Sequence, residues 1–178
     1  MRKLFVFAWE IVKIVVISLA IIVPVRYYLI QPFFVYGASM EPNFSNGNYL
    51  IINEIGYRLG EPQRSEVVVF KYPLNPSQYY IKRIVGLPGE TVEIKDGLVF
   101  IYNQSFPDGM VLDESLYLPK DRITSGNTKI KLGEDEYFVL GDNRQASSDS
   151  RRWGALPEDN IIGRAWIRAW PFNSAEVY

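Results

Sequence analysis

Apolar residues are arranged in two very different ways along this chain of 178 residues. From Leu4 to Ile30 the sequence is almost continuously apolar, and its few charged residues lie near the ends of the run. About 20 such residues are enough for a helix to cross a bilayer. After Pro32 the apolar residues come in short runs, which glycines, prolines and polar stretches separate. This change predicts an N-terminal membrane-spanning helix followed by a β-rich body.

The short runs have the length and residue types of β-strands. We expect strands at residues 49–52, 66–70, 79–85, 91–95, 98–102, 129–132, 136–140 and 163–170, and one helical turn at 157–160. Asp96-Gly97 stands between two of these runs and is a strong two-residue hairpin signal. Because no helical pattern separates the strands, the expected fold class is mainly β: an antiparallel β-sheet domain with one N-terminal transmembrane helix.

This pattern divides the chain into an anchor and a domain. We expect residues 1–31 to form a cytoplasmic tip and transmembrane anchor, and residues 32–178 an extracytoplasmic β-rich domain. Polar residues 106–126 predict a surface excursion, within a variable insertion or small subdomain at 103–128, and residues 141–154 a long polar loop. The alternative for the N-terminal run is a cleaved secretory signal. The run is long for that, and no convincing small-residue cleavage site follows it.

Charges around the apolar run predict its direction in the membrane. Three basic residues precede or enter the run, Arg2, Lys3 and Lys13, and only Arg26 lies near its far end. The positive-inside rule therefore predicts a cytoplasmic N-terminus and an outer body, in a single-pass protein of the cell membrane. Five aromatic residues then fall at the outer lipid interface, where such rings settle: Tyr27, Tyr28, Phe33, Phe34 and Tyr36.

The composition excludes several kinds of chemistry. The chain has no His and no Cys, which rules out Ser-His-Asp and Cys-His sites, His- or Cys-ligated zinc, iron–sulfur clusters and disulfides. If a serine is activated here, its base must be a lysine, a carboxylate, a tyrosine or the chain terminus. A net charge of −1 with no basic stripe argues against nucleic acid as a partner. We expect neither a cofactor nor a metal.

Ser39 is the first candidate for chemistry. It lies in the sequence Tyr-Gly-Ala-Ser-Met-Glu-Pro at residues 36–42, directly after the apolar run. A hydroxyl at this place is suited to be a nucleophile held at a membrane surface. Taken alone, however, Ser39 fits an ordinary turn serine better, because serine is a common turn and cap residue.

Lys82 is the second candidate. On a strand, Tyr80, Lys82 and Ile84 face the same way, and such large neighbours are unusual for a solvated lysine. The alternative is a surface lysine that lays its stem over apolar rings. As a general base Lys82 must be neutral, so its pKa must fall from about 10.4 to near ~8. Burial against apolar side chains supplies a fall of that size.

The third candidate is the loop at residues 141–151, with the sequence Gly-Asp-Asn-Arg-Gln-Ala-Ser-Ser-Asp-Ser-Arg. It reads simply as a solvated loop with Asx turns and local ion pairs. A calcium loop is a weaker alternative, since the aspartate spacing does not match the twelve-residue pattern. In a functional interpretation, Ser147 forms a hydrogen bond that orients the lysine amine, and Asp149 pairs with Arg151 to hold the loop still.

Together these segments resemble the successive boxes of the bacterial type I signal peptidases. The matching segments are residues 37–42, 80–90 and 141–154, in the same order and with similar spacing. The resemblance extends to residues 31–33 and 157–172, and so covers nearly the whole chain outside 106–126. One box alone is weak, whereas three in order after a membrane span are highly specific.

The resemblance implies a Ser-Lys dyad. Ser39 would attack the scissile carbonyl, and Lys82 would take its proton and pass it to the leaving amine. Ser147 would orient Lys82, and the backbone N–H of Ser39 would stabilise the oxyanion. Some members carry a hydroxyl two residues before the nucleophile, where this chain has Gly37. The expected oxyanion hole therefore lacks that side-chain donor. The supporting residues are Ser147, Asp149, Arg151, Gly37 and Asp142.

The function implied by the resemblance is removal of N-terminal signal peptides from secreted preproteins by a membrane-bound serine endopeptidase. The expected partners are those signal peptides, bound in extended form beside a strand edge, and the lipid bilayer. Two alternatives remain open. One is another Ser-Lys hydrolase of related β fold, such as the self-cleaving repressors, and the other is a non-catalytic, membrane-anchored binding module.

Overall fold

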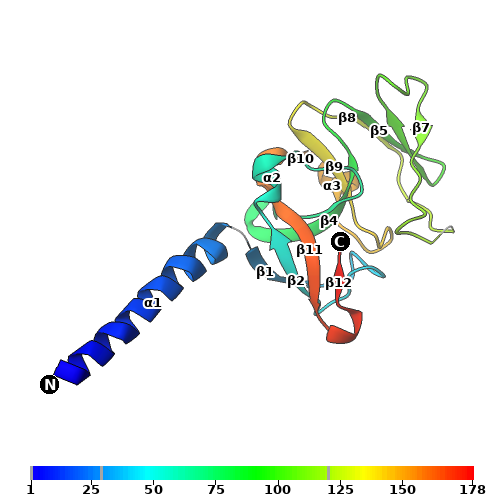
Figure 1. The fold of residues 1–178 in the computed structure, drawn as a ribbon. Helices are drawn as coiled ribbons and strands as arrows, with labels where there is room; N and C mark the ends of the chain where they lie inside the picture. Colours follow the sequence, from blue (N-terminus) through cyan, green and yellow to red (C-terminus); the bar gives the residue numbers. More distant parts are fainter. Residues whose placement is uncertain (1, 29, 120) are drawn as a thin grey trace.

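The computed structural model describes residues 2–28, 30–119 and 121–178, and it begins with one long helix, α1 (Arg2–Tyr28). Residues 3–23 of this helix have the length and apolar composition of a membrane span, and none of that stretch is buried against the described remainder of the chain. Figure 1 shows α1 extending away from a β-rich body. Parts of the predicted N-terminal region lie outside the described residues: Met1 and Leu29 altogether, and the side chains of Arg2, Pro24, Val25, Arg26, Tyr27, Tyr28 and Ile30.

The body consists of two antiparallel sheets (Figure 1). The larger has the order β1-β2-β11-β3-β4-β9-β10, with β12 beside β11, and the smaller has the order β7-β6-β5-β8. The larger sheet contains β1 (Ile30–Phe34), β2 (Tyr49–Asn53), β3 (Val67–Tyr72), β4 (Asn75–Gly86), β9 (Glu136–Leu140), β10 (Leu156–Pro157), β11 (Ile161–Trp170) and β12 (Glu176–Val177). The smaller contains β5 (Thr91–Lys95), β6 (Leu98–Tyr102), β7 (Met110–Val111) and β8 (Thr128–Lys131). The described residues thus confirm the expected fold class, antiparallel β with an apolar N-terminal helix.

Strand β3 is buried on both faces, which explains its continuous apolar sequence. Val67 and Val69 belong to a core cluster that includes Leu50 of β2. Val68 lies on the opposite face, in a second cluster with Ile84 of β4. The alternation is the period of two that a strand imposes on its side chains. The centre of the larger sheet is therefore covered on both sides.

The predicted hairpin of the smaller sheet is confirmed. Asp96 and Gly97 connect β5 to β6 and have φ angles of 53° and 81°. Two successive positive φ angles define the type I′ turn, whose twist matches that of the flanking strands. The inner faces of these strands form a third core cluster, which Val85 at the end of β4 joins. Strand β4 therefore links the two sheets.

Several elements were missed or misjudged in the sequence. Strand β1 pairs with β2 at an edge of the larger sheet, the kind of place where Pro32, which lacks an N–H, is tolerated. The expected loop at 141–154 contains a short helix, α3 (Ser150–Trp153), which Asp149 caps by accepting a hydrogen bond from the Arg151 N–H. Two further short elements were not expected, α2 (Gly56–Leu59) and the 3-10 turn η2 (Phe172–Ser174), whereas the 3-10 turn η1 (Glu158–Asn160) confirms the helical turn expected at 157–160.

Gly86 tests the packing where the two sheets meet. A Cβ at this position would lie 2.4 Å from Val92 Cγ2 and 2.9 Å from Leu132 Cδ1, both buried side chains. We expect Gly86→Ala to destabilise the fold by about 1–3 kcal/mol, the usual cost of overpacking a core. Thermal unfolding of the two proteins measures this difference. Gly60→Ala is the control, since its Cβ would meet only the Gly56 carbonyl at 3.7 Å, and equal melting of all three proteins would contradict the packing described.

Candidate active site

A cleft of about 630 Å³ opens beside β1, β2 and β4. Its walls are mostly aromatic and aliphatic, and Ser39, Lys82 and Ser148 are among its polar contributors. The remaining lining residues are Pro32, Phe33, Phe34, Val35, Tyr36, Leu50, Val69, Gln78, Tyr79, Tyr80 and Ile81. The cleft can therefore hold an extended apolar chain with a hydroxyl and an amine beside it.

The first two candidates of the sequence meet in this cleft. Lys82 Nζ and Ser39 Oγ are 2.9 Å apart and form a hydrogen bond. Ser39 is half-buried, between the fully buried Met40 and the exposed Ala38. The backbone N–H of Asn143 donates to the Ser39 carbonyl at 3.0 Å, and its side-chain amide donates to the Ala38 carbonyl at 3.0 Å. The segment that carries the serine is thus tied to the loop at 141–154.

Lys82 lies in β4 opposite Val68, and only 3% of its surface is exposed. Its amine also donates to the Ile81 carbonyl at 2.6 Å and lies 5.3 Å from the centre of the Tyr80 ring. Burial lowers the pKa of Lys82 from its ordinary 10.5 to about 8, and the carboxylates of Asp149 and Asp142 act in the opposite direction. A large neutral fraction of this amine is therefore available in mildly alkaline solution.

Gly141 is the point at which the serine segment and the loop come closest. A Cβ there would lie 2.2 Å from Ser147 Oγ and 2.5 Å from the Ser39 carbonyl oxygen, so only glycine fits without a shift. The Ser147 hydroxyl is buried and makes no hydrogen bond that meets normal geometry with any residue the structure describes. The bond expected between Ser147 and Lys82 is not among the contacts of the amine, which go to Ser39 and Ile81.

Asp149 and Arg151 form the ion pair that was expected in the loop. Arg151 Nε and Nη2 each lie 2.8 Å from an Asp149 carboxylate oxygen, and the Gly141 N–H donates to the same carboxylate at 3.1 Å. Burial raises the pKa of Asp149, but the Arg151 guanidinium and the Gly141 N–H outweigh it and hold the pKa below its ordinary value. The carboxylate is therefore ionised at neutral pH and holds both ends of the loop.

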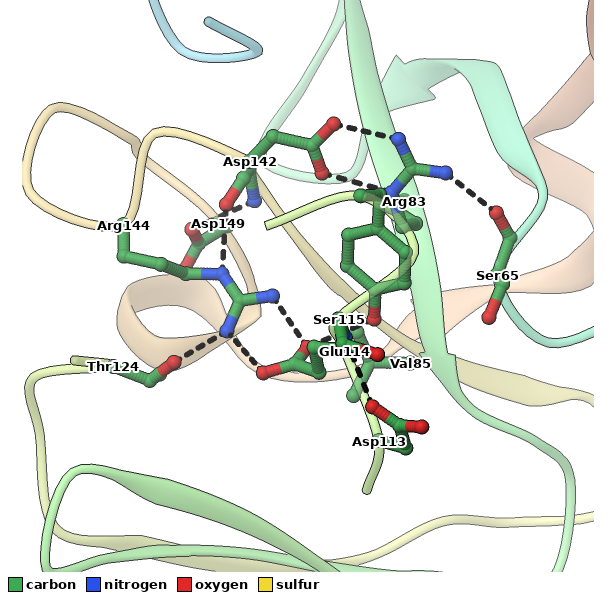
Figure 2. A network of polar contacts seen from close by, with 12 residues as sticks. Ser65, Arg83, Val85, Asp113, Glu114, Ser115, Thr124, Asp142, Arg144 and Asp149 are labelled. Atoms are coloured by element: carbon green, nitrogen blue, oxygen red, sulfur yellow. Dashed lines mark hydrogen bonds and ion pairs between the residues drawn. The ribbon is translucent and has the colours of Figure 1, made fainter. Parts of the chain in front are cut away.

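Asp142 forms a second buried pair, with Arg83, the residue after Lys82 (Figure 2). Arg83 Nε and Nη2 lie 2.8 and 2.6 Å from the two carboxylate oxygens, and the Asn43 amide donates to one of them at 2.8 Å. Asp142 thereby connects the lysine strand, the segment after Ser39 and the loop. Arg83 lies within the strand expected at 79–85, but sequence reasoning assigned it no role. Its position among buried apolar neighbours was the available signal.

Gly37 has a φ of 86°, and no atom lies within 4 Å of the place where a Cβ would stand. Its N–H donates to the Asn46 side chain at 2.9 Å. There is space for a serine side chain here, but the backbone conformation is one that residues with a side chain rarely adopt. Among the described residues, no group of three or more acidic side chains is placed to hold a metal ion.

Comparison with known proteins identifies the family. A model of the signal peptidase family, peptidase S26, matches residues 8–170. Probable signal peptidase I-2 of Synechocystis sp. is 35% identical over 167 residues, which cover 91% of this chain and 73% of that protein. Signal peptidase IB of Staphylococcus aureus is 31% identical over 170 residues, 89% of this chain and 87% of that protein. A crystal structure of a signal peptidase I from Enterococcus faecalis V583 is 32% identical in sequence and superimposes with a TM-score of 0.48. The match covers 59% of this chain and 97% of the chain in that crystal structure.

These relatives define the class of protein, a serine endopeptidase that hydrolyses peptide bonds. The chain belongs to the signal peptidase family, peptidase S26. The resemblance seen in the sequence is thereby confirmed, and so is the expected class of enzyme.

Burial of Lys82 has a consequence for stability that can be measured. Below pH 8 the ammonium is protonated in both the folded and the unfolded chain, and its burial opposes folding by about 3 kcal/mol. Between pH 8 and 10.5 only the unfolded chain holds the proton, so stability rises with pH. We expect the difference in unfolding free energy between Lys82→Met and the wild type to fall by up to about 3 kcal/mol across this window.

Unfolding in detergent at pH 7, 8, 9 and 10.5 measures that difference. Lys131→Met is the matched control, because Lys131 is exposed on β8 and its substitution removes no buried ammonium. A Lys82→Met difference that stays constant across the same range would contradict the lowered pKa.

Proposed function

We propose that this chain removes signal peptides from preproteins, with Ser39 as the nucleophile and neutral Lys82 as the general base. The observation that carries the proposal is the 2.9 Å hydrogen bond between Lys82 Nζ and Ser39 Oγ, made by an amine that is 3% exposed. A nucleophile and base within hydrogen-bond distance, with the base shifted toward neutrality, have the arrangement that activated serines require.

The proposed reaction runs in two stages. In the first, Lys82 takes the Ser39 proton as Oγ bonds to the scissile carbonyl carbon, and the carbonyl oxygen becomes an oxyanion that the Ser39 N–H stabilises. Lys82 then gives the proton to the leaving amine as the carbon–nitrogen bond breaks. In the second, a water loses a proton to Lys82 and attacks the acyl ester, and Ser39 leaves with that proton.

The supporting residues hold this arrangement in place. Asp149 with Arg151 fixes the loop, Asp142 with Arg83 joins the loop to the lysine strand, and the buried Ser147 hydroxyl beside Gly141 is the group that would orient the amine. Gly37 leaves the backbone N–H of Ser39 as the main donor to the oxyanion. Misplacing reacting groups by about 1 Å is enough to slow an enzyme by about 10²-fold, so each of these contacts matters to the rate.

The same proposal includes the membrane. Residues 1–31 serve as tip and anchor, with the N-terminus in the cytoplasm and the catalytic domain outside, as the basic residues around the span favour. Phe34 and Tyr36 are 57% and 84% exposed and lie on the rim of the cleft, close to Ser39 in sequence. Aromatic rings settle at the lipid interface, so this rim would hold the cleft at the depth where a membrane-inserted substrate emerges.

Cleavage of a labelled preprotein by the detergent-purified full chain tests the proposal. We expect release of the mature product by the wild type, and a rate at least about 10³-fold lower for Ser39→Ala and for Lys82→Ala, because loss of nucleophile or base removes most catalysis. Lys131→Ala is the control for Lys82→Ala, since Lys131 is exposed and lies on β8 of the smaller sheet.

Equal cleavage by Lys82→Ala and the wild type would mean that the base is elsewhere. Absence of cleavage by a folded wild type, with several preproteins, would favour the binding module over the enzyme. Covalent labelling of Ser39 by a serine-directed acylating inhibitor separates these two cases, since a binding module does not activate the hydroxyl.

The pH dependence of the rate gives an independent test of the base. Because only neutral Lys82 can accept the serine proton, we expect kcat/KM to rise about tenfold per pH unit and to level off near pH 8. The measurement is kcat/KM on one preprotein from pH 6 to 10. A rate that is constant between pH 6 and 9 would exclude a lysine base with this pKa.

A further inference from the structure

The excursion at 106–126 was left without a role by the sequence, yet it reaches the candidate site. Arg144 of the loop is 1% exposed, and its guanidinium is bound by two residues of this excursion (Figure 2). Nη2 and Nη1 lie 2.5 and 2.9 Å from the two carboxylate oxygens of Glu114, and Nη1 also donates to the Thr124 hydroxyl. A planar guanidinium held by both oxygens of one carboxylate has a fixed orientation.

The remaining donor of Arg144 acts on the loop itself. Its Nε donates to the Gly141 carbonyl at 3.0 Å. Gly141 is the residue whose Cα lies against both Ser147 Oγ and the Ser39 carbonyl, so its position sets the spacing between them. Glu114 therefore acts, through Arg144, on the contact between the serine segment and the loop.

The turn that begins at Glu114 also contacts the other two segments of the site. Tyr117 donates its hydroxyl to Glu114 at 2.9 Å, and the guanidinium carbon of Arg83 lies 4.1 Å from the centre of the Tyr117 ring. The Tyr117 carbonyl accepts a hydrogen bond from the Asn43 amide at 2.7 Å. One short turn of the excursion thus contacts the segment after Ser39, the residue after Lys82 and the loop that holds Ser147.

We propose that Glu114 is a positioning residue for peptide cleavage, which holds the loop against Ser39 through the buried guanidinium of Arg144. This inference rests on the proposed function, since it concerns the rate of the same reaction. Glu114 touches neither the serine nor the lysine. Its contribution is to keep Gly141, and with it Ser147, at a fixed position relative to Ser39.

Glu114→Gln is the variant that tests this inference. Glutamine keeps the shape of the side chain but offers one acceptor oxygen in place of two and leaves the buried guanidinium without a counter-charge. We expect kcat on the labelled preprotein to fall about 10–100-fold with little change in KM, because the reacting groups and not the substrate cleft are displaced. Asp108→Asn is the matched control, an exposed carboxylate-to-amide change in the same excursion.

The pH profile separates positioning from general loss of stability. The groups acting on Lys82 are its burial, which lowers its pKa, and the carboxylates of Asp149 and Asp142, which raise it. Burial is the largest of these effects, so a loosened loop that admits water moves the pH at which the rate levels off upward from about 8. A variant that is only less stable keeps the wild-type profile at temperatures where it is folded.

A double variant covers the case in which Glu114→Gln folds poorly. Glu114→Gln combined with Arg144→Met removes the unpaired buried charge, so stability should recover. The hydrogen bond from Arg144 to the Gly141 carbonyl is absent from the double variant, so kcat should stay low. Recovery of wild-type kcat together with stability would overturn the proposal, because the pair would then be merely structural.

Amide exchange gives a readout that does not depend on cleavage. The Asn143 N–H is bonded to the Ser39 carbonyl, and we expect it to exchange at least about tenfold faster in Glu114→Gln than in the wild type or Asp108→Asn. Unchanged exchange and unchanged kcat would overturn the positioning role while leaving the proposed function intact. A wild type that does not cleave, with Lys82→Ala equally inactive, would instead overturn the proposed function, and with it the reaction that Glu114 is proposed to serve.

Discussion

Removal of the Lys82 amine from water is the constraint on which the rest of the site depends. A lysine in solution is almost wholly protonated near neutral pH and cannot accept a proton from serine. Here the amine belongs to β4, beside a strand that is buried on both faces, and 3% of the residue remains exposed. Burial is the largest effect on its pKa and lowers it to about 8. The proposed role of Lys82 therefore depends on the two-sided sheet at this point, because a lysine on an exposed sheet face would stay charged.

The buried ion pairs around Lys82 follow from the same constraint. Asp142 and Asp149 lie close enough to favour the charged lysine, and two unpaired carboxylates would offset much of the effect of burial. Each is instead bound by two nitrogens of a guanidinium, from Arg83 and Arg151 respectively. A paired carboxylate has a weaker field at a distance than a free one, and the pairs also fix the loop. The arginines thus permit acidic residues near the amine that we propose as the base.

Local patterns predicted the parts of the fold that short-range chemistry determines. The Asp96-Gly97 hairpin and the strands flanking it were found in the sequence because turn type and alternation are properties of a few neighbouring residues. Strand β1 was missed because Pro32 and the adjoining apolar run obscured it, and α3 because a polar loop hides a four-residue helix capped by Asp149. Ser39 and Lys82 were candidates from their local sequence and were joined as a dyad by resemblance, whereas their contact brings a turn residue to a strand residue 43 positions away in the chain.

The contact between Glu114 and Arg144 was beyond such reasoning for a different reason. The two residues are 30 positions apart, and neither belongs to a periodic pattern. The excursion that carries Glu114 also lies outside the motifs by which the resemblance was recognised in the sequence. Yet a guanidinium as deeply buried as that of Arg144 requires an acceptor for each donor and a counter-charge, since an unpaired buried charge is strongly destabilising. A loop that places an arginine in the interior therefore demands an acidic partner from some other segment. In this chain the excursion at 106–126, which lies outside those motifs, supplies it through Glu114, and this pairing is what links the excursion to the loop beside Ser39.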